Sequence, residues 1–402
     1  MRRRVKITGI GPVTPAGIGR EAFFHGINES VSRVRALTRF GLDTGLSLVG
    51  AEIHNFDPAH FAPRLNSKRV SRYTQFGVAG TVLALEDAGL TPAEISGLAP
   101  VIITGTCSTD FEKIGRALQA VGERGPRHAH ATMVYDSPSF TVSGKIAEYL
   151  EVPTRMYSLQ TACCSGLDAI GQAAEMVASG QSDLAITGGT EAPLTQCPLF
   201  ELTAAELSPL SEGQPEKCCR PFDLWRSTGV IGEGAAIVIL EPETSPRKPY
   251  AWISGYGFSN DCDAGAGLGI ADAMEIALAN ASRRAAEVDF INAWGPGHRS
   301  IDFNEVIALK RIFGSRLAEI PCVSIKGAIG TAFGAAGAIQ TASTALTLFQ
   351  GVIPPTVNWE TADPNCPLNL SARPRRLQPS VAVINAHGLT GGNAVLVLER
   401  VC

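Results

Sequence analysis

The sequence predicts an α/β protein built from two similar halves, in which mainly parallel sheets are covered by helices. Three observations predict it: strand-like and helix-like segments alternate along the chain, their order repeats, and small apolar residues are abundant. Of the 402 residues, 45% are hydrophobic, 18% are charged and 42 are glycine. A chain with so little charge can bury a large core and pack helices closely on sheets.

The repeat consists of five pairs of segments that occur in the same order in both halves. Residues 5–11 and 251–257 each predict a strand that ends in a Gly-x-Gly turn. The other pairs are two amphipathic helices (78–88 and 271–285), two short strands (101–105 and 290–295), two buried helices after a small-residue turn (162–178 and 330–348) and two closing strands (235–241 and 393–399). Five matches in one order indicate an internal duplication.

A proline-rich segment separates the halves. Pro242, Pro246 and Pro249 lie among charged and hydroxyl residues, which is typical of an exposed crossing loop. We therefore predict an N-terminal half of residues 1–245 and a C-terminal half of residues 246–402. Residues 193–226 have no counterpart in the second half, and we interpret them as an insertion over one face of the first.

Composition and charge argue against several classes of function. The formal net charge of −4 gives no general attraction to nucleic acid or to anionic membranes. No apolar signal follows the basic N-terminus, and the uncharged stretch 327–359 predicts a buried helix and a loop rather than a membrane span. The ten cysteines therefore predict reduced thiols in the cytoplasm, and their spacing predicts no metal site. We expect no cofactor.

One segment carries a clear chemical signal. Residues 161–171, Thr-Ala-Cys-Cys-Ser-Gly-Leu-Asp-Ala-Ile-Gly, connect a predicted strand (155–159) to an apolar helix. Cys163 would lie near the positive end of the helix dipole, which favours the thiolate, and backbone N–H groups there can stabilise an oxyanion. The spacing alone fits a buried structural cysteine equally well.

Four further segments accompany this one. They are Asp-Leu-Ala-Ile-Thr-Gly-Gly-Thr-Glu-Ala at 183–192, Pro-Phe-Asp-Leu-Trp-Arg-Ser-Thr-Gly-Val-Ile-Gly-Glu-Gly at 221–234, Ser-Ile-Lys-Gly-Ala-Ile-Gly at 324–330 and Asn-Ala-His-Gly-Leu-Thr-Gly-Gly-Asn at 385–393. In this order, over essentially the whole chain, the segments resemble the β-ketoacyl synthases of the thiolase superfamily, particularly the elongating enzymes of fatty-acid and type II polyketide systems. The resemblance implies a thiolase-like duplicated αβαβα layered fold, with Cys163 as the acyl-accepting nucleophile.

The chain departs from this family at both catalytic histidines. In condensing members, two histidines assist decarboxylation of a malonyl carrier and attack by the resulting carbanion. Trp294 stands at the first position, and Thr331 stands at the second, five residues after Lys326. An indole offers one N–H donor and no base, so we predict that ordinary decarboxylative condensation is very slow. Acylation of Cys163 needs a thiolate and an oxyanion hole and can survive.

Other family positions are retained or replaced. The resemblance places Asp302 and Glu305 as structural support, and we expect Lys326 to organise them rather than to act as a nucleophile. His298 and His387 are the candidate catalytic replacements for the missing histidines, although a lone histidine is more often structural.

The resemblance also implies where the acyl substrate lies. We expect it to contact Trp294, Thr331, Gly388 and Leu389. Leu389 matches the gatekeeping phenylalanine of the family, and a smaller aliphatic group there could widen the acyl entry. Ordinary core packing of Leu389 is an equal alternative.

Two functions from different classes follow. One is an atypical acyltransferase that loads an acyl chain onto Cys163 and passes it to a carrier thiol, an amine, a hydroxyl or water. The other is a non-catalytic partner similar to chain-length factors: the missing histidines favour it, but such partners commonly have another residue at the nucleophile position. We predict the enzyme. Its expected partners are an acyl carrier protein or acyl-CoA thioester, and a second chain in a homodimer or in a heterodimer with a ketosynthase.

Overall fold

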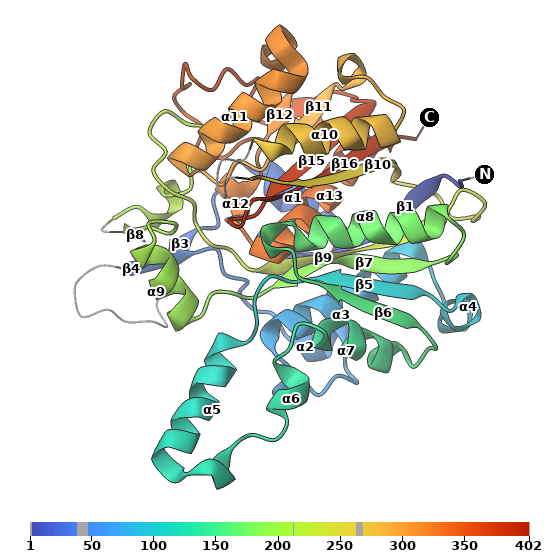
Figure 1. Cartoon of the computed structure of the whole chain (residues 1–402), viewed down its shortest axis with the longest axis vertical. Helices are drawn as coiled ribbons and strands as arrows, with labels where there is room; N and C mark the ends of the chain where they lie inside the picture. Colours follow the sequence, from blue (N-terminus) through green and yellow to red (C-terminus); the bar gives the residue numbers. More distant parts are fainter. Residues whose placement is uncertain (1, 38–46, 212, 263–267, 402) are drawn as a thin grey trace.

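The computed structural model describes residues 2–37, 47–211, 213–262 and 268–401 (Figure 1). One mixed sheet runs through the molecule, in the strand order β12-β11-β15-β16-β10-β1-β9-β7-β5-β6. The strands of the first half are β1 (Val5–Thr14), β5 (Val101–Gly105), β6 (Arg155–Leu159), β7 (Ala185–Glu191) and β9 (Gly234–Pro242). Those of the second half are β10 (Ala251–Asn260), β11 (Phe290–Asn292), β12 (Cys322–Val323), β15 (Val381–His387) and β16 (Gly392–Arg400).

The strand order repeats between the halves. The order β1-β9-β7-β5-β6 corresponds strand by strand to β10-β16-β15-β11-β12, and the two sets join where β1 pairs with β10. Each set also carries an irregularity at the same point, between Ile7 and Gly9 on β1 and between Ile253 and Gly255 on β10. The duplication predicted from the five pairs of segments is therefore present in the fold.

The sequence predicted that each Gly-x-Gly motif forms a turn. This prediction was wrong, because both strands continue past the motif. A Cβ atom on Gly9 would lie 2.2 Å from the carbonyl oxygen of Ala84, and one on Gly255 would lie 2.1 Å from that of Ala277. Helices α3 (Arg72–Ala88) and α10 (Gly269–Asn280) lie directly on these strands. The glycines are required because a helix backbone approaches a strand backbone.

The prediction of mainly parallel sheets was wrong. Among the strands of the described residues, the parallel pairs are β5–β6, β5–β7, β11–β12 and β11–β15. β9 and β16 run antiparallel to both of their neighbours, and β1 runs antiparallel to β10. Parallel neighbours need a long crossover connection, whereas β15 and β16 are joined by the short hairpin 388–391. The alternation of predicted elements did not reveal this connection.

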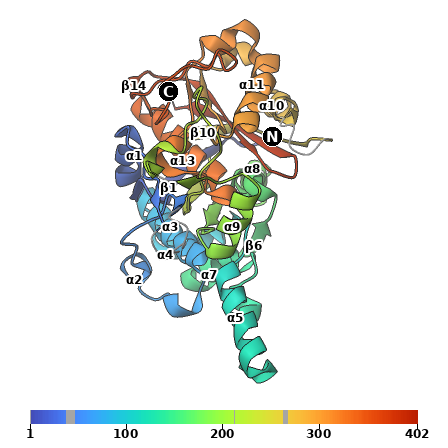
Figure 2. The ribbon, with the colours of Figure 1, turned by 90° about the vertical axis from the view of Figure 1, so that its left-hand side faces the viewer.

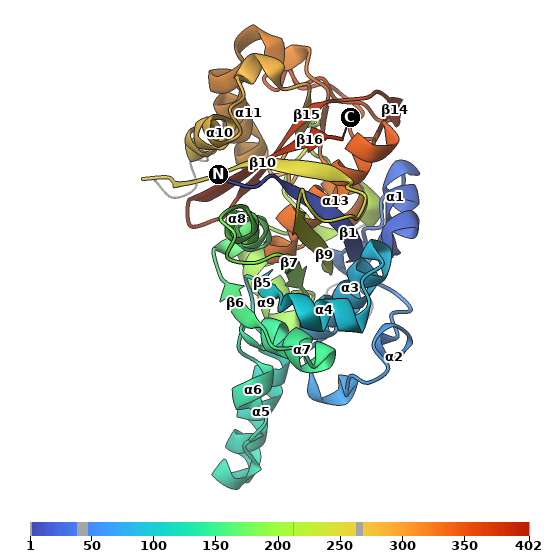
Figure 3. The same ribbon diagram turned by 90° about the vertical axis from the view of Figure 1, so that its right-hand side faces the viewer.

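The helices form three layers around the sheet. Helices α8 (Ser165–Ala178) and α13 (Phe333–Gln350) contact each other in the middle of the molecule, between the two halves of the sheet (Figure 3). α3 and α7 (Thr141–Leu150) cover the outer face of the first half, and α10 and α11 (Arg299–Phe313) cover that of the second. This is the predicted αβαβα layering. None of the helices in the described ranges has the length and apolar character needed to cross a lipid bilayer.

Smaller elements complete the fold. They are α1 (Arg20–Asn28), α2 (Pro58–Phe61), α4 (Pro92–Leu98), α5 (Phe111–Arg124), α6 (Met133–Asp136), α9 (Gln196–Ala204), α12 (Lys326–Ile329) and the short strands β2 (Gly17–Ile18), β3 (Arg35–Ala36), β4 (Ser47–Gly50), β8 (Leu210–Ser211), β13 (Val352–Ile353) and β14 (Arg375–Arg376). α5 and α6 project from the body as an arm (Figures 1 and 2). The segment 193–226 contains α9, which lies beside the cavity described below.

At Gly166, the contact between α8 and α13 leaves no room for a side chain. A Cβ atom on Gly166 would lie 2.5 Å from the carbonyl oxygen of Gly334. We therefore expect Gly166→Ala to lower the free energy of unfolding by about 1–3 kcal/mol, because overpacked helices must separate. The matched control is Gly97→Ala on the exposed face of α4, where a Cβ atom has no neighbour within 4 Å among the described atoms. This control should be neutral or stabilising by up to about 1 kcal/mol. Urea unfolding measures both, and equal effects would contradict the proposed packing.

Candidate active site

Cys163 lies in a short 3₁₀ turn, residues Ala162–Cys164, which leads directly into α8. Ala162 adopts a left-handed backbone conformation with φ of 51°, which is strained for a residue with a Cβ atom. Ser165 holds the turn closed, since its hydroxyl accepts from Thr161 N at 2.9 Å and donates to the Ala162 carbonyl at 2.5 Å. The turn therefore presents Cys163 at the start of a helix, as the sequence predicted.

Six of the predicted site residues line one cavity. They are Cys163, Trp294, His298, Thr331, His387 and Leu389. The remaining walls are Leu202, Leu207, Gly229, Val230, Ile231, Pro296, Ile301 and Phe333, none of which was predicted as a site residue, although the resemblance places Pro296 at a family threonine position. Nearly all of these additional groups are apolar, so the cavity suits an aliphatic acyl chain. Residues Leu202 and Leu207 come from the predicted insertion, which therefore closes one side of the site.

Gly388 and Leu389 occupy different places in the site. A Cβ atom on Gly388 would lie 3.0 Å from Ala162 Cβ and 3.5 Å from Cys163 N, so Gly388 packs against the nucleophile turn without lining the cavity. Leu389 is 47% exposed and stands at the edge of the cavity. An exposed position at the edge is expected of an entry residue rather than of a core residue.

Lys326 lies behind Trp294 and does not line the cavity. Its Nζ lies 4.2 Å from the centre of the Trp294 ring and 3.1 Å from Gln340 Oε1. Burial lowers the pKa of Lys326 to about 7. Glu305 accepts hydrogen bonds from the backbone N–H groups of Trp294 and Gly295, both at 2.7 Å, and burial raises the pKa of its carboxyl. These buried groups fix the backbone that carries Trp294.

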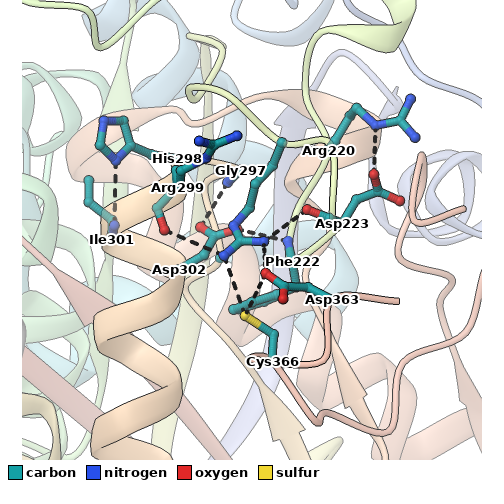
Figure 4. A network of polar contacts seen from close by, with 12 residues as sticks. Arg220, Phe222, Asp223, Gly297, His298, Arg299, Ile301, Asp302, Asp363 and Cys366 are labelled. Atoms are coloured by element: carbon teal, nitrogen blue, oxygen red, sulfur yellow. Dashed lines mark hydrogen bonds and ion pairs between the residues drawn. The ribbon is translucent and has the colours of Figure 1, made fainter. Parts of the chain in front are cut away.

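Asp302 fixes the neighbouring loop (Figure 4). Its carboxylate accepts from Phe222 N at 2.7 Å and from Gly297 N at 3.0 Å, and it lies 3.6 Å from Arg226 Nε. Burial raises the pKa of Asp302 to about 7. Arg226 in turn is bound to Asp363 at 2.6 Å. Asp302 and Glu305 therefore act as supports for the segment 294–298, away from the cavity.

His298 has a structural contact that limits its chemistry. It occupies the N-cap of α11, where its Nδ1 accepts from Ile301 N at 3.4 Å (Figure 4). Burial, with a smaller effect from Arg226, lowers the pKa of His298. A neutral ring that accepts at Nδ1 carries its proton on Nε2, so its lone pair is already used. His387 is buried at the end of β15 and has a different partner, Asn393, at 2.9 Å.

Two further cysteines lie close to Cys163. Cys107, which the sequence analysis did not single out, is hydrogen-bonded through its side chain to Cys163, and this contact together with burial raises the pKa of Cys107 far above its ordinary value. Cys164 Sγ contacts the carbonyl oxygens of Ala386 at 3.4 Å and Gly392 at 3.3 Å. Burial raises the pKa of Cys164 strongly. Across the described part of the chain, no three His, Cys, Asp or Glu side chains are grouped to hold a metal ion.

Known protein families match both halves of the chain. The model described as "Beta-ketoacyl synthase, N-terminal domain" matches residues 2–245, and "Beta-ketoacyl synthase, C-terminal domain" matches residues 250–360. Among curated proteins, the chain is 33% identical to a "Putative polyketide beta-ketoacyl synthase 1" of Streptomyces cyaneus, with 96% of each chain covered. It is 31% identical to "3-oxoacyl-[acyl-carrier-protein] synthase 2" of Coxiella burnetii, with 100% of this chain and 99% of that protein covered.

Solved structures agree with these relatives. "The ishigamide ketosynthase/chain length factor" superposes with a TM-score of 0.93 at 29% identity, over the full length of both chains. The complex titled "AntDE:AntF (apo): type II PKS acyl-carrier protein in complex with its ketosynthase bound to the hexaketide" superposes with a TM-score of 0.90 at 27% identity, also over both full lengths.

The environments of Cys163 and Cys164 predict different reactivity. Iodoacetamide should alkylate Cys163, which faces the cavity, well before Cys164, which is sealed under the hairpin with a strongly raised pKa. Peptide mapping is the measurement, because the exposed thiols of Cys197 and Cys262 will also react. Cys163→Ala serves as the control and should leave Cys164 unlabelled. Preferential labelling of Cys164 in the unaltered chain would overturn the assignment of the nucleophile.

Proposed function

The chain belongs to the β-ketoacyl synthase family, and we propose that it acts there as an acyltransferase that carries its acyl group as a thioester on Cys163. One observation supports this proposal: the nucleophile turn opens on an apolar cavity that Trp294 and Thr331 also line, and the family resemblance assigns these two positions to the catalytic histidines of condensing members. The turn supplies the cysteine and the backbone N–H groups that acyl loading needs. The two replacements leave the site without the histidines that condensation needs.

The surroundings of Trp294 and Thr331 support the second half of this proposal. Stabilising an enolate requires donors and a base aimed at the developing charge. The Trp294 ring stacks against Lys326 and supplies no base. The Thr331 hydroxyl is neutral and cannot take up a proton at ordinary pH. We therefore propose that decarboxylation of a malonyl carrier is not the normal reaction of this site.

Exposed apolar surface on two elements favours the binding of a partner chain. β6 is the last strand of the main sheet, and its Met156 and Tyr157 are 52% and 46% exposed. Val134 and Tyr135 on the projecting arm are also exposed. An uncovered edge strand with apolar side chains is a ready site for pairing with another chain. We propose a homodimer or a heterodimer with a ketosynthase, and an acyl carrier protein or acyl-CoA as the thioester donor.

A non-catalytic partner similar to a chain-length factor is the second candidate. The observation that favours it is the double replacement at Trp294 and Thr331, since a subunit that only shapes an acyl tunnel needs no histidines. The retained Cys163 and its strained turn weigh against it, because strain at Ala162 is costly to keep without a function.

Acylation of Cys163 distinguishes these candidates. The purified chain is incubated with acylated carrier protein, alone and beside a ketosynthase chain, and the intact mass is measured. We expect the mass of one acyl group to be added to the unaltered chain and to Cys164→Ala, and not to Cys163→Ala. No acylation under either condition would favour the non-catalytic partner.

Restoring the histidines tests the account of condensation. The unaltered chain alone should release little labelled carbon dioxide from a malonyl carrier, and Trp294→His combined with Thr331→His should raise this release at least about 10²-fold. Trp294→Phe combined with Thr331→Val is the matched control and should stay at the background rate. Strong release from the unaltered chain that persists after both His298→Ala and His387→Ala would contradict our reading of the site.

A further inference from the structure

We propose that His387 and Asn393 form a proton-transfer pair beside Cys163, and that the acyl group is passed to an alcohol. This inference rests on the proposed function, because it requires an acyl group on Cys163. It goes further by naming a base, a positioning residue and the class of acceptor.

Hydrogen bonding fixes the ring of His387. His387 and Asn393 face each other across the β15–β16 hairpin, and His387 Nδ1 lies 2.9 Å from Asn393 Oδ1. Asn393 Nδ2 donates to the carbonyl oxygen of Gly391 at 3.0 Å, which orients the amide with its oxygen toward the ring. An amide oxygen only accepts, so His387 must carry its proton on Nδ1. Asp261 Oδ2, at 4.0 Å from Nδ1, favours the same tautomer.

The lone pair of Nε2 is consequently on the side of the ring away from Asn393. His387 is 97% buried and lines the same cavity as Cys163. The next residue, Gly388, packs on the nucleophile turn, where its Cβ position is 3.5 Å from Cys163 N. His387 thus lines the cavity beside the cysteine with Nδ1 engaged by Asn393, which leaves Nε2 as the nitrogen that can act as a general base. In contrast, the basic nitrogen of His298 is occupied by the cap of α11.

Thr331 supplies a second observation. Its hydroxyl is buried and has no hydrogen-bond partner among the described atoms, although it belongs to a residue that lines this cavity. A buried hydroxyl without a partner is unfavourable, and a polar group of a bound ligand would satisfy it. An alcohol can accept from Thr331 Oγ1 while it donates to His387 Nε2.

The cavity also selects among acceptors. A carbanion acceptor lacks its stabilising groups, as argued above. An amine is a hydrated cation at neutral pH and would lose its hydration in an apolar cavity. A neutral aliphatic alcohol needs no carbanion-stabilising group and loses no ionic hydration shell. Its alkyl part fits apolar walls such as Leu202, Val230 and Ile301.

The transfer balances without a further reactant. The alcohol oxygen attacks the thioester carbon while His387 Nε2 accepts the hydroxyl proton. The C–S bond then breaks, Cys163 leaves as a thiolate and takes the proton from Nε2. The products are an ester and the free Cys163 thiol. Asn393 does not touch the reacting atoms; it is a positioning residue that accepts from Nδ1 and so directs the lone pair of the neutral ring to Nε2.

A single-turnover experiment tests the inference. Cys163 is first loaded from an acylated carrier, the carrier is removed, and 1-butanol, n-butylamine or buffer alone is added. Mass spectrometry follows the loss of the acyl-enzyme and identifies the product. We expect the butyl ester to form faster than the amide or the free acid. Release as free acid or amide at equal or higher rates would overturn the alcohol as acceptor.

Variants test the pair itself. His387→Gln should slow ester formation about 10²–10⁴-fold, and His387→Phe is a second variant in case the first folds poorly. Asn393→Leu should also slow ester formation, whereas Asn393→Asp should restore much of the rate, because a carboxylate accepts from Nδ1 as the amide does. The matched control is His128→Gln on the exposed arm, which should leave the rate unchanged.

The loading step separates the possible failures. A variant that acquires no acyl group has lost its fold or its nucleophile, and if the unaltered chain acquires none, the proposed function itself has failed. Normal loading followed by ester formation at an unchanged rate in both His387 variants would overturn this inference and leave the proposed function intact. Equal rates for Asn393→Leu and Asn393→Asp would overturn the positioning role of Asn393.

Discussion

The site depends on the close contact between α8 and α13. The carbonyl oxygen of Gly334 at the start of α13 approaches both Gly166 on α8 and Gly189 on β7, at 2.5 Å and 2.6 Å from the places where Cβ atoms would stand. Farther along the same contact, Gly337 faces Leu167, with its Cβ position at 2.8 Å from that side chain. Any larger residue at these points would push the halves apart. Since Cys163 belongs to one half and most of the cavity to the other, the glycines set the width of the site.

A second constraint acts behind the cavity wall. Glu305 accepts from two backbone N–H groups of the segment 294–295 and from Asn385 Nδ2 at 2.7 Å. Breaking such a buried charged cluster is costly, since each remaining group would lose its partner in an apolar interior. The cluster bonds to the backbone and not to the side chain of Trp294. The frame of the site can therefore persist whichever side chain stands at position 294, so Lys326 and Glu305 are compatible with tryptophan there.

The sequence predicted the features that depend on local patterns. The five repeated segments and the turn at Cys163 could be found from spacing and order, and the replacements at Trp294 and Thr331 from the resemblance to the family. Antiparallel pairing of β9 and β16 could not, because strand direction follows from connections that periodicity does not record. Cys107 was missed for a similar reason: it is distant from Cys163 in sequence and belongs to no motif, and only the parallel pairing of β5 with β6 brings the two turns together.

Asn393 shows how a residue can be visible in the sequence and still be misread. The sequence places it at the start of the closing strand 393–399 and at the end of the segment 385–393, whereas the hairpin register shows that it lies opposite His387. Directly opposed residues of an antiparallel pair lie on one face, so their contact follows from the register and not from either residue alone.

His387, the proposed base, and Cys163, the proposed nucleophile, lie on segments that are attached to each other. Gly388 N donates to the Gly392 carbonyl at 2.8 Å, and Cys164 Sγ contacts that same carbonyl at 3.3 Å, so the hairpin is attached to the nucleophile turn. The backbone of Trp294, in contrast, is bound by Glu305, and that of Thr331 donates to the Val230 carbonyl at 2.8 Å. In the proposed reaction, loading and transfer both depend on the turn and the hairpin attached to it, whereas condensation would also need the side chain presented by the segment 294–298. The side chain at position 294 can consequently differ while the structure that would perform the proposed transfer is kept.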